Sequence, residues 1–347
     1  MTCRLRRVAL VVGAVGAGAL ARLLARRRAE LASVAPELRT PIVLLPAHVT
    51  GPRVLALARR GIARPGPVPT TVPIRSERVP ASAASGSAGA ADGVRVVLYE
   101  GGDRTGPRPA VVWIHGGGTI MGNPEQSHGA VARTAEVVGA LVVSVDYRLA
   151  PEHPFPAALE DCWAALVWLA DHADDLGVDP TRIAVGGDSA GGMLAASLAQ
   201  LARDRGGPPV AFQALVYPML DDRTVLRGEP GRTTRVWTHR SNEYAWTAYL
   251  GHAPSPDPER PYAAPARTDD LAGLPPAWIG VGDLDLFLEE DLDYAARLEA
   301  AGVACEVHVE PGMYHGADAL LPNRPTMRAF RARADEALRA AIGEQRS

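Results

Sequence analysis

A serine in a glycine-rich segment is the first residue whose setting suggests chemistry. Ser189 lies in the pattern Gly187-x-Ser189-x-Gly191, after a short apolar run and before a stretch with helical periodicity. In a sharp strand-to-helix turn, glycines on either side avoid clashes and the serine Oγ is pushed out of the sheet. The N-terminus of the following helix favours developing negative charge. The pattern predicts a serine nucleophile; the alternative is a turn that merely packs a helix on a strand.

A second glycine-rich segment, His115-Gly116-Gly117-Gly118, follows another apolar run. Acyl transfer builds an oxyanion, and glycines let main-chain N–H groups approach that oxygen closely. We therefore predict an oxyanion hole formed by the N–H groups of Gly116, Gly117 and Ala190, with His115 orienting the loop. A dinucleotide-binding loop fits poorly, because G-x-G-x-x-G is absent after this run.

The general base is expected to follow both the serine and an acidic loop along the chain. Four of the nine histidines follow Ser189, namely His239, His252, His308 and His315. The first two precede any suitable acidic loop, and His308 lies inside a predicted strand. His315 lies in a glycine-flanked loop after that strand, from which its imidazole could reach Ser189. We predict that His315 is the base.

The acidic partner is expected after the apolar run 277–281, where two aspartates compete. Asp283 stands just beyond the run and could cap the turn, whereas Asp285 lies deeper in the loop. Spacing alone leaves both open. Three further acids are interpreted as residues of the first turn of a helix, where they complement its dipole: Glu289, Glu290 and Asp291.

These segments need a scaffold that brings distant parts of the chain together. From residue 94 onward, apolar runs alternate with helical stretches such as 157–169 and 191–201. The pattern predicts an α/β fold, with a mostly parallel sheet, helices on both faces and reactive groups at the carboxyl ends of the strands. The predicted strands are 94–99, 110–114, 141–145, 183–185, 212–217, 277–281 and 305–309, with an edge strand within 72–79.

Composition narrows the remaining possibilities. The chain has 347 residues, 47% of them hydrophobic, which suits one large domain or a core with a lid. Its net charge of −3 argues against nucleic-acid binding. All basic residues are arginines, so lysine chemistry and a Walker-type phosphate loop are excluded. Three cysteines lie far apart and form no zinc or CxxC pattern: Cys3, Cys162 and Cys305. The predicted chemistry requires no metal or organic cofactor.

The N-terminal part differs from the rest. Residues 4–28 combine an apolar run with arginines on both flanks. This suits a helix of a lid, a membrane-surface anchor or a cleaved signal sequence, so cytoplasmic, membrane-associated and secreted locations all remain open. Seven prolines between residues 36 and 70 exclude a long helix, and 81–93 is interpreted as a flexible loop. We expect residues 1–70 to form an N-terminal segment and lid region, and 71–347 the catalytic domain.

Together, these segments resemble the hormone-sensitive-lipase-like esterases, the HGGG branch of the α/β-hydrolase superfamily. The resemblance covers about residues 72–340, and its motifs together are highly specific. Leu286 departs from the family pattern, which often has proline there, and Ala317-Asp318 stands where Phe or Leu often follows His-Gly. The segments that carry the resemblance are His115 to Gly118, 146–157 (DYRLAPEHPFPA), Gly187 to Gly192, Asp283 to Glu290 and Gly312 to Gly316.

The resemblance implies an α/β-hydrolase fold with an eight-stranded, mostly parallel sheet and a partly N-terminal helical lid, with an insertion at about 221–262. In the family the acid lies nine residues before a helical tyrosine; counting back from Tyr294 implies Asp285, with Asp283 as the alternative. Asp146 and Arg148 are expected to pair or to bond the backbone beneath the site. Aromatic residues of the insertion are expected either to line an acyl or alcohol pocket or to form the core of the lid: Trp237, Tyr244, Trp246 and Tyr249.

The implied function is that of a serine carboxylesterase, acting on a small-molecule ester of short to medium acyl chain through an acyl-enzyme on Ser189. A lipase, an amidase or arylformamidase, and a sugar-ester deacetylase would use the same triad. A non-catalytic receptor on this fold is an alternative of another class, although such a receptor is expected to lack a triad member. The sequence leaves open whether the chain forms a homodimer or uses residues 4–28 to associate with a membrane surface.

Overall fold

The computed structural model describes residues 31–40, 48–62, 70–80, 93–102, 106–228 and 234–343. The basic and apolar segment 4–28, and most of the predicted loop 81–93, lie outside the described residues. Among the residues that are described, no helix is long and apolar enough to cross a membrane.

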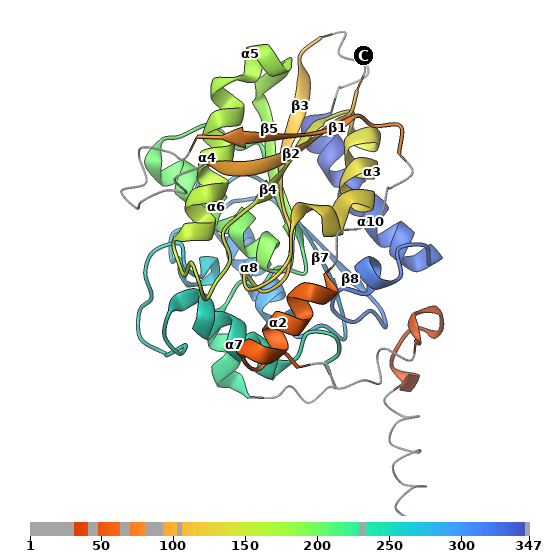
Figure 1. Ribbon diagram of the computed structural model, residues 1–347, viewed down its shortest axis with the longest axis vertical. Helices are drawn as coiled ribbons and strands as arrows, with labels where there is room; N and C mark the ends of the chain where they lie inside the picture. Colours follow the sequence, from red (N-terminus) through yellow and green to blue (C-terminus); the bar gives the residue numbers. More distant parts are fainter. Residues whose placement is uncertain are drawn as a thin grey trace, which may run out of the picture.

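A single eight-stranded sheet forms the centre of the described structure (Figure 1). β2 pairs antiparallel with β1 and with β4, and all other neighbours are parallel. This confirms the predicted fold class and every predicted strand. In spatial order the strands are β1 (Ile74–Val79), β2 (Val94–Glu100), β4 (Leu141–Asp146), β3 (Arg108–Ile114), β5 (Val178–Asp188), β6 (Phe212–Val216), β7 (Ala277–Gly282) and β8 (Cys305–Glu310).

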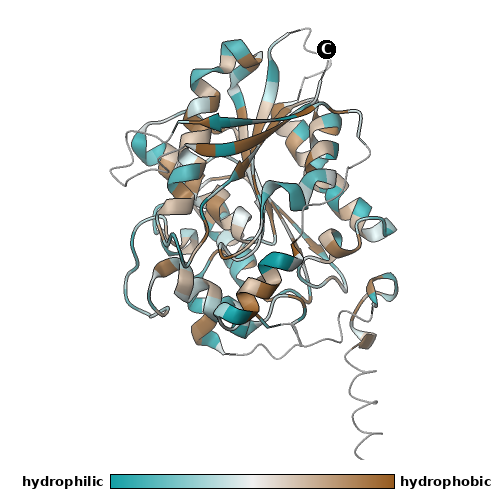
Figure 2. Ribbon diagram, viewed as in Figure 1, coloured by the Kyte–Doolittle hydropathy of each residue, from teal (hydrophilic) through white to brown (hydrophobic). Residues whose placement is uncertain are grey.

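The strand alternation buries both faces of the sheet. In β3, Val112 and Ile114 face one hydrophobic cluster, whereas Val111 and Trp113 face the other. Figure 2 shows hydrophobic residues concentrated on these central strands. Because both faces are apolar, the sheet must be covered by helices on each side.

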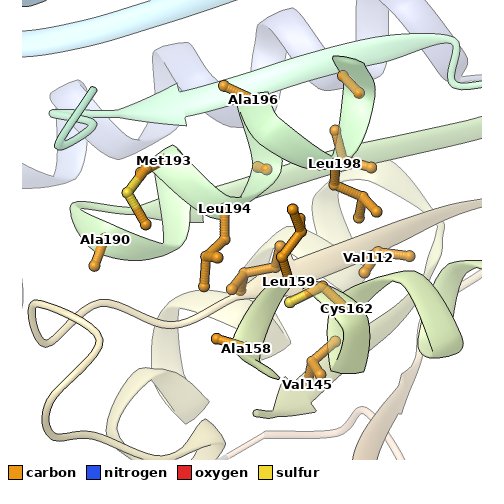
Figure 3. Close-up of a cluster of buried hydrophobic side chains, with 14 of the residues drawn as sticks. Val112, Val145, Ala158, Leu159, Cys162, Ala190, Met193, Leu194, Ala196 and Leu198 are labelled. Carbon is orange, nitrogen blue, oxygen red and sulfur yellow. The ribbon is translucent and has the colours of Figure 1, made fainter. Parts of the chain in front are cut away.

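The first cluster lies beneath α4 (Ala157–Asp171), α6 (Ala190–Arg205) and α8 (Leu288–Ala300). Figure 3 shows Leu159 and Cys162 of α4 meeting Leu194 and Leu198 of α6 over the sheet. The second cluster is covered by α3 (His128–Val138) and α10 (Pro325–Ile342), on the opposite face. Because both clusters are closely packed, the sheet is a rigid support for the loops at the carboxyl ends of its strands.

Two segments distant in sequence meet outside this core. α2 (Pro52–Gly61) lies near α7 (His239–Leu250), the helix of the insertion (Figure 1). The residues just before α2 bind the start of α7: His48 Nδ1 lies 2.8 Å from Thr238 Oγ1, and the Val49 N–H donates to Ser241 Oγ over 3.0 Å. The segment 48–62, which contains α2, and the start of α7 therefore lie side by side.

Candidate active site

The predicted nucleophile lies on a strained turn between β5 and α6. Ser189 has φ 56° and ψ −118°, a conformation that L-residues rarely adopt. A Cβ on Gly187 would lie 2.4 Å from the carbonyl oxygen of Ile114, and one on Gly191 only 2.0 Å from it. Both positions must therefore be glycine, because β3 passes directly alongside the turn.

Three of the predicted residues form one hydrogen-bonded chain. Ser189 Oγ lies 3.0 Å from His315 Nε2, and His315 Nδ1 lies 2.8 Å from Asp285 Oδ2. Ser189 is 5% exposed to solvent, His315 is 6% exposed and Asp285 is fully buried. Little water therefore competes for these hydrogen bonds. This is the geometry of a nucleophile, a base and an acid that orients the base.

The two aspartates that the spacing left open have different contacts. Asp283 accepts a hydrogen bond from the Gly312 N–H over 2.7 Å and so caps the loop that carries His315. Asp285 binds the imidazole and also accepts the Phe287 N–H over 3.0 Å. The structure thus places Asp285, not Asp283, against His315.

Aromatic rings hold the His315 imidazole from two sides. Phe287 packs edge-on against it with ring centroids 5.1 Å apart, and Tyr217 with centroids 4.7 Å apart. Both rings are buried. Neither ring was selected from the sequence: Tyr217 follows β6 outside any motif, and Phe287 lies within the segment Asp283 to Glu290 but carries no reactive group.

The predicted oxyanion loop lies directly against the serine. A Cβ on Gly116 would lie 3.3 Å from Ser189 Cβ, which shows how closely the two segments approach. Within the described part of the chain, no group accepts a hydrogen bond from the N–H of Gly116, Gly117 or Ala190. These are the three amides that the sequence predicts as donors to an oxyanion.

His115 lies under this loop and not among the reacting groups. Its Nδ1 contacts the Gly116 carbonyl oxygen at 2.8 Å, and its ring stacks on Tyr147 with centroids 4.2 Å apart. Tyr147 in turn donates its hydroxyl to the His115 carbonyl over 2.9 Å. Burial lowers the pKa of His115 to about 4, so the ring is neutral at pH 7 and suited to holding the loop.

Trp237, an aromatic residue of the insertion, lies beside the site, in line with the expectation that such residues line a pocket. A Cβ on Gly118 would lie only 2.4 Å from Trp237 Cη2, and the Trp237 ring centroid is 6.4 Å from that of His315. Trp246 and Tyr249 are instead completely buried in the core.

A tight turn at Val236 aims this tryptophan. Val236 has φ 66°, and the Trp237 N–H donates to the Arg235 carbonyl over 2.7 Å. This three-residue turn is rare and strained, and a β-branched residue makes it more so. The Trp237 Nε1–H also donates to Asn242 Oδ1 over 3.3 Å. The strain is therefore stored next to the predicted site.

Of the two expectations for Asp146 and Arg148, pairing with one another is wrong: Asp146 binds Arg95 at 2.7 Å and Arg148 binds Asp161 at 2.8 Å. The alternative, a bond to the backbone, is found for Arg148, whose Nη2 donates to the Ala157 carbonyl over 3.4 Å. β4 ends at Asp146, and Arg148 lies beyond it in the following loop, where the strand no longer sets the direction of the side chains. Each of the two therefore meets a partner of its own.

Glu290 has contacts beyond those that the sequence predicted. It stands in the first turn of α8, as predicted, but it is buried and accepts the N–H groups of Leu220 and Asp221 over 2.7 and 3.3 Å. It also contacts the Thr224 hydroxyl. Its main partners are thus the segment after β6, which no local pattern at position 290 could reveal.

The fold and the site together define a class of protein with a serine, a histidine and an aspartate at the carboxyl ends of parallel strands. A family model for the alpha/beta hydrolase fold matches residues 111–319. The chain belongs to this family, and its esterase relatives confirm the hormone-sensitive-lipase-like group that its motifs resemble.

Two curated relatives come from Mycobacterium tuberculosis. The chain is 44% identical over 214 residues to esterase LipI, covering 60% of this chain and 65% of LipI. It is 46% identical over 212 residues to carboxylesterase NlhH, covering 60% of this chain and 66% of NlhH. The chain thus matches slightly less than two thirds of the length of either relative.

Solved structures match over more of the chain. A structure described as bacterial heroin esterase is 35% identical, has a TM-score of 0.82, and aligns with 90% of this chain and 99% of its own. Esterase LipW from Mycobacterium marinum is also 35% identical, with a TM-score of 0.78 and coverage of 90% and 96%. The similarity therefore extends beyond residues 111–319, which the family model matches.

Proposed function

We propose that this protein is a serine carboxylesterase that hydrolyses small-molecule esters through an acyl-enzyme on Ser189. The observation that carries the proposal is the buried chain from Ser189 Oγ through His315 to Asp285, with distances of 3.0 and 2.8 Å. Esterases among the curated relatives and the solved structures support the same activity.

The mechanism follows from these contacts. As Ser189 Oγ forms a bond to the ester carbonyl carbon, its proton passes to His315 Nε2 and the carbonyl electron pair moves to the oxygen. Gly116, Gly117 and Ala190 donate their N–H groups to this oxyanion; the loss of one such donor costs about 3 kcal/mol of barrier. Asp285 stabilises the imidazolium and keeps its Nδ1–H oriented.

Collapse of the intermediate breaks the bond to the alcohol, which leaves with the proton from His315. Water then attacks the acyl-enzyme while His315 again takes a proton. The bond to Ser189 Oγ breaks, the serine regains a proton from His315, and the carboxylic acid is released. Each step uses only side chains and amides that the geometry brings together.

Within this activity, we propose a preference for short to medium acyl chains. The Trp237 ring lies over Gly118 and close to His315, and it is only 5% exposed. The Trp237 side chain, held in place by Asn242, occupies space beside the position of the ester carbonyl. A long acyl chain would have to displace this side chain. We propose that the lid expected within residues 1–70 and 221–262 includes α2 and α7, with α7 next to Trp237 at Gly118.

A p-nitrophenyl ester series from acetate to palmitate tests both parts. We expect turnover that peaks at short chains and disappears in Ser189→Ala while the protein stays folded by circular dichroism. Turnover that persists in Ser189→Ala would contradict the role of the serine. A folded wild-type protein inactive on every ester would contradict the esterase proposal.

The same series tests the role of Trp237. We expect Trp237→Leu to move the peak of turnover toward longer acyl chains, because a smaller side chain leaves more space beside the ester carbonyl. Trp168→Leu, a half-buried tryptophan on α4 away from the site, is the matched control and should leave the profile unchanged. A wild-type peak at long chains would instead indicate a lipase and support a membrane-surface role for residues 4–28.

A further inference from the structure

A buried ion cluster that the mechanism does not use connects two of the loops bearing the proposed triad. Arg331 of α10 lies between two carboxylates: its Nη2 is 2.6 Å from Asp188 Oδ1, and its Nε binds Asp318 Oδ2. Asp188 immediately precedes Ser189. Asp318, in α9 (Ala317–Leu320), follows His315 by three residues.

A tyrosine links the same cluster directly to the imidazole. Tyr217 donates its hydroxyl to Asp318 Oδ1 over 2.8 Å and accepts from Arg331 Nη2 at 3.4 Å. The Tyr217 ring is the one that packs edge-on against His315. Tyr217 has φ 37°, and its N–H donates to the Gly280 carbonyl over 2.6 Å, so its backbone is fixed in an uncommon conformation.

The cluster lies in a setting where charges are costly unless they are paired. The side chains of Asp188, Asp318 and Arg331 are 10%, 1% and 15% exposed. Burial disfavours the charge on Arg331, but Asp188 and Asp318 outweigh it and raise the arginine pKa well above its usual value. A guanidinium suits this place because its fork holds two carboxylates at once.

We propose that Arg331 is a positioning residue, which sets the separation between Ser189 and His315 by clamping the strand end before the serine to the helix after the histidine. This inference rests on the proposed function. Ser189 and His315 are 126 residues apart in the sequence, and no side chain of the triad fixes both backbones. Arg331 holds both, one through Asp188 and the other through Asp318 and Tyr217.

Removal of the clamp should therefore lower kcat rather than substrate binding. In Arg331→Met we expect kcat to fall about 10- to 100-fold, because misplacement of reacting groups by an ångström costs about this much. KM should change less than about threefold, since Arg331 does not touch the substrate. Arg331→Lys keeps the charge but not the fork, so we expect it to recover part of the kcat that Arg331→Met loses.

The matched control is Arg333→Met, which removes an exposed arginine from the same helix and should leave kcat unchanged. Asp318→Asn provides a second, milder variant in case Arg331→Met does not fold; we expect its kcat to fall about three- to tenfold. The two changes should be non-additive when combined, because they remove the same link.

A spectroscopic readout separates this inference from the activity itself. The proton between His315 Nδ1 and Asp285 gives a low-field proton resonance in such hydrogen bonds, whether or not an ester is turned over. We expect it to shift or broaden in Arg331→Met and to be unchanged in Arg333→Met.

Two results would overturn the clamp. The first is a folded Arg331→Met, or a folded Asp318→Asn, with wild-type kcat and an unaltered resonance. The second is a loss in Arg331→Met that appears only in KM. If the wild-type protein lacks esterase activity, the proposed function fails, whereas the resonance still reports on the clamp.

Discussion

Two aspartates in one loop, Asp283 and Asp285, divide two tasks that the sequence could not assign. Asp283 caps the loop through the Gly312 N–H, whereas Asp285 holds the His315 imidazole. The difference lies in which way each side chain points as the chain turns out of β7. Both residues carry the same charge and lie two positions apart in the sequence. Only their contacts show which one caps the loop and which one binds the imidazole.

Substitution of each aspartate should therefore have a different outcome. We expect Asp285→Asn to lower kcat about 10⁴-fold with little change in stability, because the imidazole loses its orienting carboxylate. Asp283→Asn should keep kcat within about threefold and lower the free energy of unfolding by about 1 kcal/mol, because a weaker acceptor remains at the cap. Steady-state kinetics and urea unfolding measure both. Equal kinetic losses in the two variants would contradict this division.

At the level of elements, the first turn of α8 is unusual in burying two acids. Glu290 binds the segment after β6, whereas neither oxygen of Asp291 has a hydrogen-bond partner within the described residues. Burial, together with Glu290 and Asp285, raises the pKa of Asp291 well above its usual value. The folded state therefore retains a proton on Asp291 at pH values where the unfolded chain has lost it.

This makes the effect of Asp291 on stability dependent on pH. The folded protein binds more protons than the unfolded chain between the unfolded and folded pKa values of Asp291, so stability falls as pH rises through that window. Asn does not titrate, so we expect Asp291→Asn to gain on the wild type between pH 5 and 7, by at most about 1.4 kcal/mol per pH unit. Urea unfolding at several pH values measures this gain.

Asp293→Asn is the matched control, because Asp293 is exposed on the same helix. Over the same pH range, Asp291→Asn should gain more on the wild type than Asp293→Asn does. If the difference between Asp291→Asn and the wild type is constant from pH 5 to 7, the raised pKa is wrong.

The central strands β2 to β7 were predictable because each contains a buried apolar run, and the motifs fell at the ends of some of them. The start of β5 was not, because Asp179 to Arg182 are polar and largely exposed. Ser189, His315 and the oxyanion loop could be selected from the sequence since glycine patterns mark them. Glu290, Tyr217 and Arg331 could not. Apart from Asp318, which precedes Arg331 by 13 residues, the partners of their side chains named above lie 66 to 143 residues away and leave no local pattern.

At the scale of the whole molecule, a single arginine fastens the described N-terminal helix to the catalytic body. Arg59 of α2 donates to the carbonyls of Ile120 and Ala150 over 2.7 and 2.8 Å and pairs with Glu152 at 2.7 Å. Ile120 follows the oxyanion loop, so α2 is attached next to the site. Val54 and Leu57, on the other face of α2, are exposed to solvent. Few apolar contacts therefore help Arg59 to hold the helix in place.

Loss of this attachment should release α2 while the sheet remains intact. We expect amide hydrogens of residues 52–61 to exchange at least about tenfold faster in Arg59→Ala than in the wild type, because local opening then breaks fewer bonds. Hydrogen exchange with mass spectrometry measures this. Arg60→Ala, which removes an exposed neighbour on the same helix, should exchange at the wild-type rate. Uniformly faster exchange across the sheet would contradict a local role.

In the proposed mechanism, Ser189 is the nucleophile that becomes acylated, and His315 and Asp285 activate it. The most direct measurement is intact-mass and peptide mass spectrometry after reaction with a p-nitrophenyl alkylphosphonate, which traps such a serine by displacement of p-nitrophenol. We predict one adduct per chain, located on Ser189, formed at least about 10³-fold more slowly in His315→Ala. An active enzyme that forms no adduct, forms it on another residue, or forms it equally fast without His315 would contradict the account.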